Sequence, residues 1–186
     1  MSTPFRKVDE RLVHQGHVVS FHEVDFEGPD GVRFGRDVVR HPGAVSVVPV
    51  LDDGRVVMVR QFRAALEGDL LEVPAGKRDV ADEPPELTAR RELVEEVGYE
   101  AGELVELAAI HHSPGFCDEV NHIFLATDLV ATERSVDGPE EEHMTIELLP
   151  LVDAFAAIAR GAVTDAKSVV GLTLAAHHLG VVVPRS

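Results

Sequence analysis

The sequence predicts a layered fold of mixed α/β type, in the α+β sense, with strands first, one central helix, more strands and closing helices. In the first half, short apolar runs alternate with turns rich in Gly, Pro and Asp. Near the middle, Pro84-Pro85 and Gly98 are typical start and stop signals of a helix. Because strands and helices do not alternate regularly along the chain, we do not expect a βαβ repeat.

The strands of the first half follow from apolar runs that end at turn residues. The segment Glu27-Gly28-Pro29-Asp30-Gly31 is a turn, and Asp52-Asp53-Gly54 is a hairpin signal between two dense apolar runs. The last run of this half is short and stops at Pro74. The predicted strands are 17–26, 32–40, 44–51, 56–62 and 70–73.

The second half opens with the central helix, which is expected to start at Pro84-Pro85, to run to Val97 and to end at Gly98. A polar loop at 133–143 separates the last strand from the others. Strands are predicted at 104–111, 120–126 and 144–151, and helical segments near 153–160 and 165–179.

Length and composition set the broad class of the protein. A chain of 186 residues suits one domain, with residues 1–41 as a strand-rich arm and residues 42–186 as the main domain. The single cysteine, Cys117, excludes an internal disulfide. The start of the chain lacks an apolar core segment, and no uncharged apolar run reaches the roughly 18 residues of a membrane span. A cytoplasmic protein that does not enter membranes is therefore expected.

The charge balance restricts the partners. With 17 basic and 33 acidic residues, the chain has a formal charge of −16, which repels nucleic acid backbones and anionic membranes. Most of these charges are expected to form a solvated acidic surface. A phosphate ester could bind only where arginines or divalent cations reverse the local sign.

The central helix carries an unusual group of carboxylates. Glu92, Glu95 and Glu96 are three and four residues apart, so they share one helix face. Like charges at this spacing destabilise a helix, and burial makes the conflict worse. A hard divalent cation with oxygen ligands removes the conflict. The alternative is an acidic face in solvent, paired with Arg90 and Arg91.

Gly76, Glu83 and the run Arg91-Glu92-Leu93-Val94-Glu95-Glu96-Val97-Gly98-Tyr99 together resemble the Nudix box of the Nudix hydrolases. The family pattern has five residues between its glycine and first glutamate, whereas six separate Gly76 from Glu83, which we interpret as an insertion in the loop before the helix. The resemblance implies a Nudix-type α/β/α sandwich with a mixed sheet and a strand-rich amino-terminal arm.

The flanking segments narrow the resemblance to the ADP-ribose pyrophosphatase group of that family. They are Val59-Arg60-Gln61-Phe62-Arg63, Leu71 to Gly76, Ser113 to Glu119 and Asp165-Ala166-Lys167. The resemblance implies hydrolysis of ADP-ribose to AMP and ribose 5-phosphate, with Mg²⁺ or Mn²⁺ as the cofactor. It also implies that the arm helps to form a homodimer.

The resemblance assigns three sets of site residues. The metal ligands would be Glu92, Glu96, the carbonyl of Ala75 and Glu141 from the polar loop. Glu95, Glu141, Glu142 and Arg91 would be catalytic, with Arg91 orienting the glutamates. The substrate would contact Arg63, Glu72, Pro114 and Phe116.

Several alternatives stay open on the sequence alone. The substrate could be another nucleoside diphosphate sugar, or the protein could bind ADP-ribose without hydrolysing it. Cys117, close to His111 and His112, could act as a thiol nucleophile with a histidine base, although a small loop residue is the simpler interpretation. The adjacent histidines of 111–112 and 177–178 point apart, so neither pair chelates a metal by itself.

Overall fold

The computed structural model describes residues 4–135 and 143–182, and these residues form two compact units. The first unit contains the chain up to residue 43 together with residues 111–120, and the second contains residues 44–110 and the chain from 121 onward. Among the described residues, no helix has both the length and the apolar composition needed to cross a bilayer.

The first unit is an antiparallel sheet of three strands in the order β1-β2-β3. The strands are β1 (Arg6–Gln15), β2 (Ser20–Glu27) and β3 (Arg33–Arg40). Segment 111–120 continues this unit, because the amide of Val39 donates to the Phe116 carbonyl at 2.7 Å. The sequence analysis predicted strands close to β2 and β3, but it did not predict β1. That strand is mostly exposed and lacks an apolar face, so its backbone pairing with β2 defines it.

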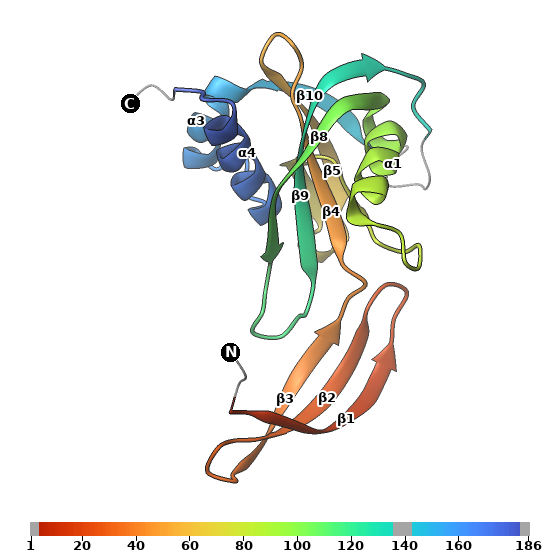
Figure 1. Cartoon of the computed structure of the whole chain (residues 1–186), viewed down its shortest axis with the longest axis vertical. Helices are drawn as coiled ribbons and strands as arrows, with labels where there is room; N and C mark the ends of the chain where they lie inside the picture. Colours follow the sequence, from red (N-terminus) through yellow and green to blue (C-terminus); the bar gives the residue numbers. More distant parts are fainter. Residues whose placement is uncertain (1–3, 136–142, 183–186) are drawn as a thin grey trace. The chain divides into compact units, whose positions relative to one another are not determined.

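The second unit contains two sheets, ordered β7-β4-β9-β8 and β10-β5-β6 (Figure 1). Its strands are β4 (Ala44–Pro49), β5 (Arg55–Arg63), β6 (Gly68–Glu72), β7 (Ala75–Lys77), β8 (Tyr99–His111), β9 (Val120–Ala131) and β10 (Thr145–Pro150). Strand β4 is antiparallel to β7 and parallel to β9, so the sheet is mixed, as expected. The short strand β7 was not predicted, because three residues after a proline give no apolar period.

Helices cover both faces of this unit, with α1 on one side and α3 and α4 on the other (Figure 1). The α-helices are α1 (Pro85–Val97), α3 (Ala154–Ala159) and α4 (Ala166–His178), and two short 3₁₀ turns are η1 (Ala64–Leu66) and η2 (Leu151–Asp153). The predicted central helix is confirmed at both ends. Pro85 is its first residue, and Gly98 caps it in the left-handed conformation, donating its amide to the carbonyls of Leu93 and Val94.

The two faces of the sheet bury separate apolar cores. Val45 and Val47 of β4 pack with Leu93 of α1 in one core, whereas Val48 and Val50 pack with the α4 side in the other. Successive side chains of a strand point to opposite faces, so a continuous apolar run is buried on both sides. This arrangement confirms the α/β/α sandwich.

Candidate active site

Helix α1 presents two buried carboxylates to strand β7, which follows Pro74 and takes the place of the turn that the sequence suggested. Glu92 is 8% exposed and Glu96 is 4% exposed, although both are acidic. Since they lie four residues apart, they share the inner face of the helix. The amide of Ala75 donates to Oε2 of Glu96 at 2.9 Å, so this carboxylate is fixed against the first residue of β7.

Gly76, the middle residue of β7, leaves room for the second carboxylate. A β-carbon at Gly76 would lie 1.9 Å from Cδ of Glu92 and 2.2 and 2.3 Å from its two oxygens. These separations are far below van der Waals contact, so no other residue fits here without moving Glu92. The Glu92 carboxylate thus lies directly against the backbone of Gly76.

Arg91 lies among the carboxylates and neutralises part of their charge. Its Nη1 is 2.9 Å from Oε1 of Glu92 and 2.9 Å from Oε2 of Glu95. Burial is the largest influence on the pKa of Arg91 and lowers it, but the charges of Glu92 and Glu95 outweigh burial and raise that pKa above its usual value. The guanidinium therefore stays charged and holds the two glutamates in place.

The extra residue before the helix is accommodated in the loop. Asp82 adopts a positive φ of 60°, which is uncommon for a residue with a side chain. Beyond it, Glu83 accepts a hydrogen bond from Oγ1 of Thr88 at 2.8 Å and lies 3.5 Å from Nη2 of Arg91. Glu83 therefore reaches the arginine of the helix despite the longer spacing.

Arg63 and Glu72, both expected to meet the substrate, pair with each other. Nε of Arg63 donates to Oε1 of Glu72 at 2.9 Å, and its Nη2 contacts Oε2. Glu72 is only 1% exposed, whereas the side chain of Arg63 is 38% exposed. Glu72 also pairs with Lys167 of α4, whose Nζ lies 2.6 Å from Oε2.

Lys167 was noted in the sequence only as part of the Asp165-Ala166-Lys167 resemblance, and no role was predicted for it. Asp165 caps α4 by accepting from the amide of Ser168 at 2.9 Å. An Asp three residues before a Ser at a helix start is a signal that could have located this cap. The pairing of Lys167 with Glu72 joins residues 95 positions apart, so local sequence could not reveal it.

The remaining predicted site residues fall in the first unit or outside the described residues. Pro114 and Phe116 belong to the first unit, where their loop pairs with β3 and the Phe116 ring is exposed. Cys117 follows in the same loop and is a free, half-buried thiol. Glu141 and Glu142 lie outside the described residues.

The donor set at α1 fits a hard divalent cation. Two buried carboxylates of like charge lie next to the β7 backbone, which has no side chain at Gly76, and oxygen donors of this kind suit Mg²⁺. Within residues 4–135 and 143–182, however, no three His, Cys, Asp or Glu side chains converge as a ready metal site. One or two carboxylates are nevertheless enough for Mg²⁺, which usually keeps several waters or substrate phosphates as its other ligands.

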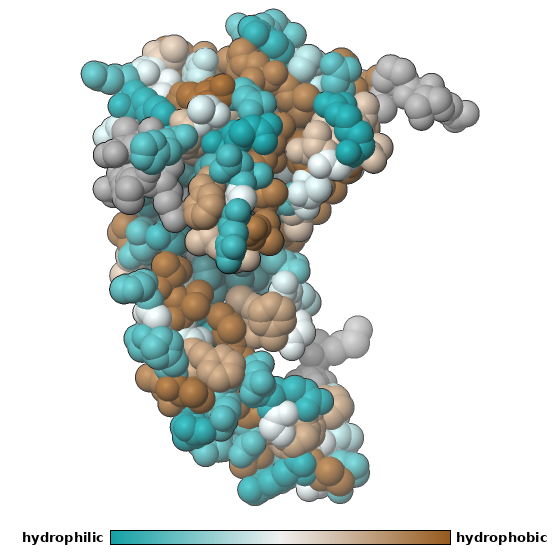
Figure 2. Space-filling view, turned by 180° about the vertical axis from the view of Figure 1, so that it is seen from behind, coloured by the Kyte–Doolittle hydropathy of each residue, from teal (hydrophilic) through white to brown (hydrophobic). Residues whose placement is uncertain are grey.

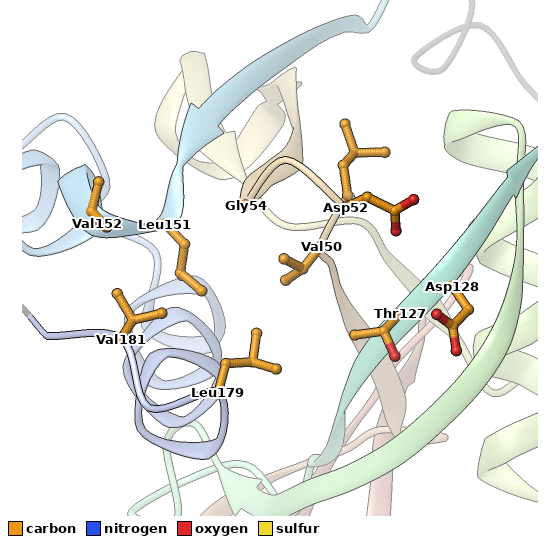
Figure 3. Close-up of a pocket in the computed structure, with 10 residues that line it drawn as sticks. Val50, Asp52, Gly54, Thr127, Asp128, Leu151, Val152, Leu179 and Val181 are labelled. Atoms are coloured by element: carbon orange, nitrogen blue, oxygen red, sulfur yellow. The ribbon is translucent and has the colours of Figure 1, made fainter.

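A separate pocket of about 320 Å³ lies at the other end of β4 (Figure 3). Leu151, Leu179 and Val181 line one side of it, and Val50 lies across from them beside Thr127 and Asp128 of β9. Strand β4 pairs with β7 through Ala44–Ser46, whereas the pocket begins at Val50. None of the predicted site residues that the structure describes lines this pocket.

Comparison with known proteins identifies relatives of this chain. The family model of the NUDIX domain matches residues 40–170. The chain is 40% identical over 163 residues to the ADP-ribose pyrophosphatase of Bacillus subtilis, covering 88% of each chain. It is 37% identical over 173 residues to the ADP-ribose pyrophosphatase of Mycobacterium tuberculosis, covering 93% of this chain and 83% of the relative.

Two further matches extend this picture. The GDP-mannose pyrophosphatase of Citrobacter koseri is 34% identical over 155 residues, covering 75% of this chain and 80% of the relative. A crystal structure of an ADP compounds hydrolase superposes with a TM-score of 0.84 over 97% of both chains at 24% identity, which shows a shared fold. With its carboxylate helix, its glycine in β7 and a family match over most of its length, the chain belongs to the NUDIX domain family.

Proposed function

We propose that this protein hydrolyses the diphosphate bond of ADP-ribose, giving AMP and ribose 5-phosphate, with Mg²⁺ or Mn²⁺ as the cofactor. The observation that carries the proposal is the pair of buried carboxylates, Glu92 and Glu96, held against the Ala75–Gly76 backbone. Membership of the NUDIX family and the names of the two ADP-ribose pyrophosphatase relatives support the substrate.

Glu92 and Glu96 would hold the cation together with the carbonyl of Ala75, and Glu141 would complete the site from outside the described residues. When bound, a divalent cation neutralises diphosphate charge and lowers the pKa of a coordinated water. This also explains how a protein with a formal charge of −16 can accept an anionic substrate.

The chain's own residues supply the proton acceptor and the orientation. Glu95, Glu141 and Glu142 are the candidates for taking a proton from the attacking water. Glu95 is held at 2.9 Å by Arg91, which fixes its position relative to Glu92. Phosphoryl transfer depends chiefly on positioning and charge stabilisation, so no covalent nucleophile is needed and Cys117 has no role in this scheme.

Arg63 is the residue that we assign to the substrate diphosphate. The hydrogen bond from its side chain to Glu72 is the largest influence on the pKa of Arg63 and raises it, so the guanidinium stays charged. The carboxylate of Glu72 is buried and already bound by Arg63 and Lys167. We therefore assign Glu72 the role of orienting Arg63 rather than a direct contact with the nucleotide. Pro114 and Phe116 remain proposed substrate contacts.

The test is product analysis with the purified protein. ADP-ribose and Mg²⁺ should give AMP and ribose 5-phosphate, and the Glu96→Gln variant should lose at least about two orders of magnitude in rate, because metal ligands and their supports have effects of this size. Glu86→Gln is the matched control, since Glu86 lies on the same helix with an exposed side chain paired to Arg90. Turnover by Glu96→Gln at the parent rate would remove Glu96 from the metal site.

A second substrate is favoured by one observation, the GDP-mannose pyrophosphatase relative. Parallel reactions with ADP-ribose, ADP-glucose, GDP-mannose and NADH at equal concentrations would rank the candidates. A preference for GDP-mannose would change the proposed substrate but not the proposed reaction. Tight binding of ADP-ribose without products would instead indicate a non-catalytic binding protein.

We further propose that the protein is a cytoplasmic homodimer and that the arm forms its interface. The support is the surface of the arm, where apolar side chains are visible among charged ones (Figure 2). Its exposed apolar residues are Phe5, Leu12, Val13, Val18, Val19 and Val32. Light scattering coupled to gel filtration should give twice the chain mass of 20.2 kDa, and Leu12→Glu should shift the species toward the monomer.

A further inference from the structure

The start of α4 holds a buried group of charges beside the proposed metal site. Nζ of Lys167 lies 2.6 Å from Oε2 of Glu72 and 2.8 Å from Oδ2 of Asp165. Lys167 is 5% exposed, and with Arg63 the group contains two positive and two negative charges. A buried charge is stable only when it is paired, so each member depends on the others.

The same helix start also binds the backbone of the segment that leads into β7. The amide of Val73 donates to Oγ of Ser168 at 2.9 Å, and this hydroxyl in turn donates to Oδ2 of Asp165 at 2.7 Å. Ser168 is 0% exposed, so it cannot touch a substrate in this structure. Its side chain can therefore act on the reaction through the groups it bonds, which are the Val73 amide and Asp165.

From residue 72 to residue 75, each position is then fixed by a different contact. Glu72 is bound by Lys167, and the Val73 amide by Ser168. The carbonyl of Pro74 accepts from the Val47 amide at 2.9 Å, and the Ala75 amide donates to Glu96 at 2.9 Å. The segment is thus held between α4 on one side of the sheet and α1 on the other.

We infer that Ser168 and Lys167 are positioning residues, which hold the Glu72–Val73 segment so that the Ala75–Gly76 backbone meets Glu92 and Glu96 in the geometry that binds the cation. This inference rests on the proposed function for the identity of the cation site. The positioning acts before substrate arrives, so it is measurable in the metal-free protein and with the metal alone. A contact from Lys167 to substrate would instead act only when substrate is bound.

The decisive variant is Ser168→Ala, which removes a hydroxyl and leaves the Val73 amide without its acceptor. Titration with Mn²⁺ followed by electron paramagnetic resonance should show affinity weakened about tenfold, the lower end of the effect of removing a residue that supports metal ligands. In the metal-free protein, hydrogen exchange across residues 71–77 should become faster. The matched control is Thr173→Val on the same helix, whose hydroxyl donates within the helix to the Val169 carbonyl at 2.6 Å, and it should match the parent.

Lys167 gives a second, independent test that does not depend on Ser168→Ala folding normally. Lys167→Met should weaken Mn²⁺ binding and lower kcat with ADP-ribose more than it raises KM, and Lys167→Arg should recover part of both losses. Parent-like Mn²⁺ affinity in Ser168→Ala and Lys167→Met would overturn the inference, as would a rise in KM alone for Lys167→Met. Absence of ADP-ribose turnover in the parent would defeat the proposed function, whereas the Mn²⁺ titrations would still decide the positioning role.

Discussion

Replacing Gly76 by alanine should weaken metal binding strongly while leaving the protein folded. The added β-carbon would lie 1.9 Å from Cδ of Glu92, whereas carbon atoms in contact are about 3.5–4.0 Å apart. The carboxylate must therefore move by roughly 2 Å. Because it is the end of a flexible side chain, it can rotate away from β7 while the backbone stays in place.

Moving Glu92 should impair metal binding and catalysis more than it lowers the free energy of unfolding. Overpacking of a buried position costs about 1–3 kcal/mol, and rotation of Glu92 keeps the loss near the lower end. Metal sites tolerate ligand displacements of only about 0.2 Å, and a misplacement of about 1 Å can lower the rate about a hundredfold. We expect Gly76→Ala to lose at least about a hundredfold in kcat/KM, which is about 2.7 kcal/mol of transition-state stabilisation.

The assay compares ADP-ribose turnover, Mn²⁺ affinity and urea unfolding of Gly76→Ala with those of Gly68→Ala. The control is suitable because a β-carbon at Gly68 would meet its nearest neighbour, the Leu66 carbonyl oxygen, at an ordinary 3.7 Å. Normal turnover and Mn²⁺ binding by Gly76→Ala would refute the reasoning that Glu92 must occupy this position.

Three further outcomes follow from the charges of the site. Mg²⁺ at about 100 times its dissociation constant should add about 2.7 kcal/mol to the free energy of unfolding and raise Tm by about 5–10 °C, and an unchanged melting curve would indicate that the carboxylates do not bind it. Arg91→Gln should melt lower without metal but gain more from Mg²⁺ than the parent, because Glu92 and Glu95 lose their shared cation, and an equal gain would contradict the role of Arg91. Burial is the largest influence on the pKa of Asp165 and raises it, but Lys167 and Ser168 outweigh burial and lower that pKa below its usual value. The charged carboxylate therefore stabilises the fold above the pKa of the unfolded chain, and this stabilisation is lost as the pH falls through the folded pKa. Asp165→Asn should thus be less stable than the parent at pH 7, and in urea titrations the difference should shrink as the pH falls below the unfolded-chain pKa of about 3.9. A difference that is constant with pH would exclude the ion pair as its cause.

Local pattern determined the elements whose signals lie within a few residues. Helix α1 was predicted from Pro84-Pro85 to Val97 because proline and glycine restrict the backbone at its two ends. The spacing of Glu92 and Glu96 placed both on one face because every α-helix turns by the same angle. The β4 run was predicted as a strand because its apolar residues are continuous, and the structure buries it on both faces.

Tertiary structure alone decided what those elements meet. The sequence could not show that β7 brings Gly76 against Glu92, or that Lys167 pairs with Glu72 from 95 positions away, because such contacts depend on how the sheet and helices pack. It also could not define β1, which has charges but no apolar face and exists through pairing with β2. Short-range steric effects determine the backbone conformation of a residue. The partner of a buried charge depends on the whole fold, because the fold determines which opposite charge is buried next to it.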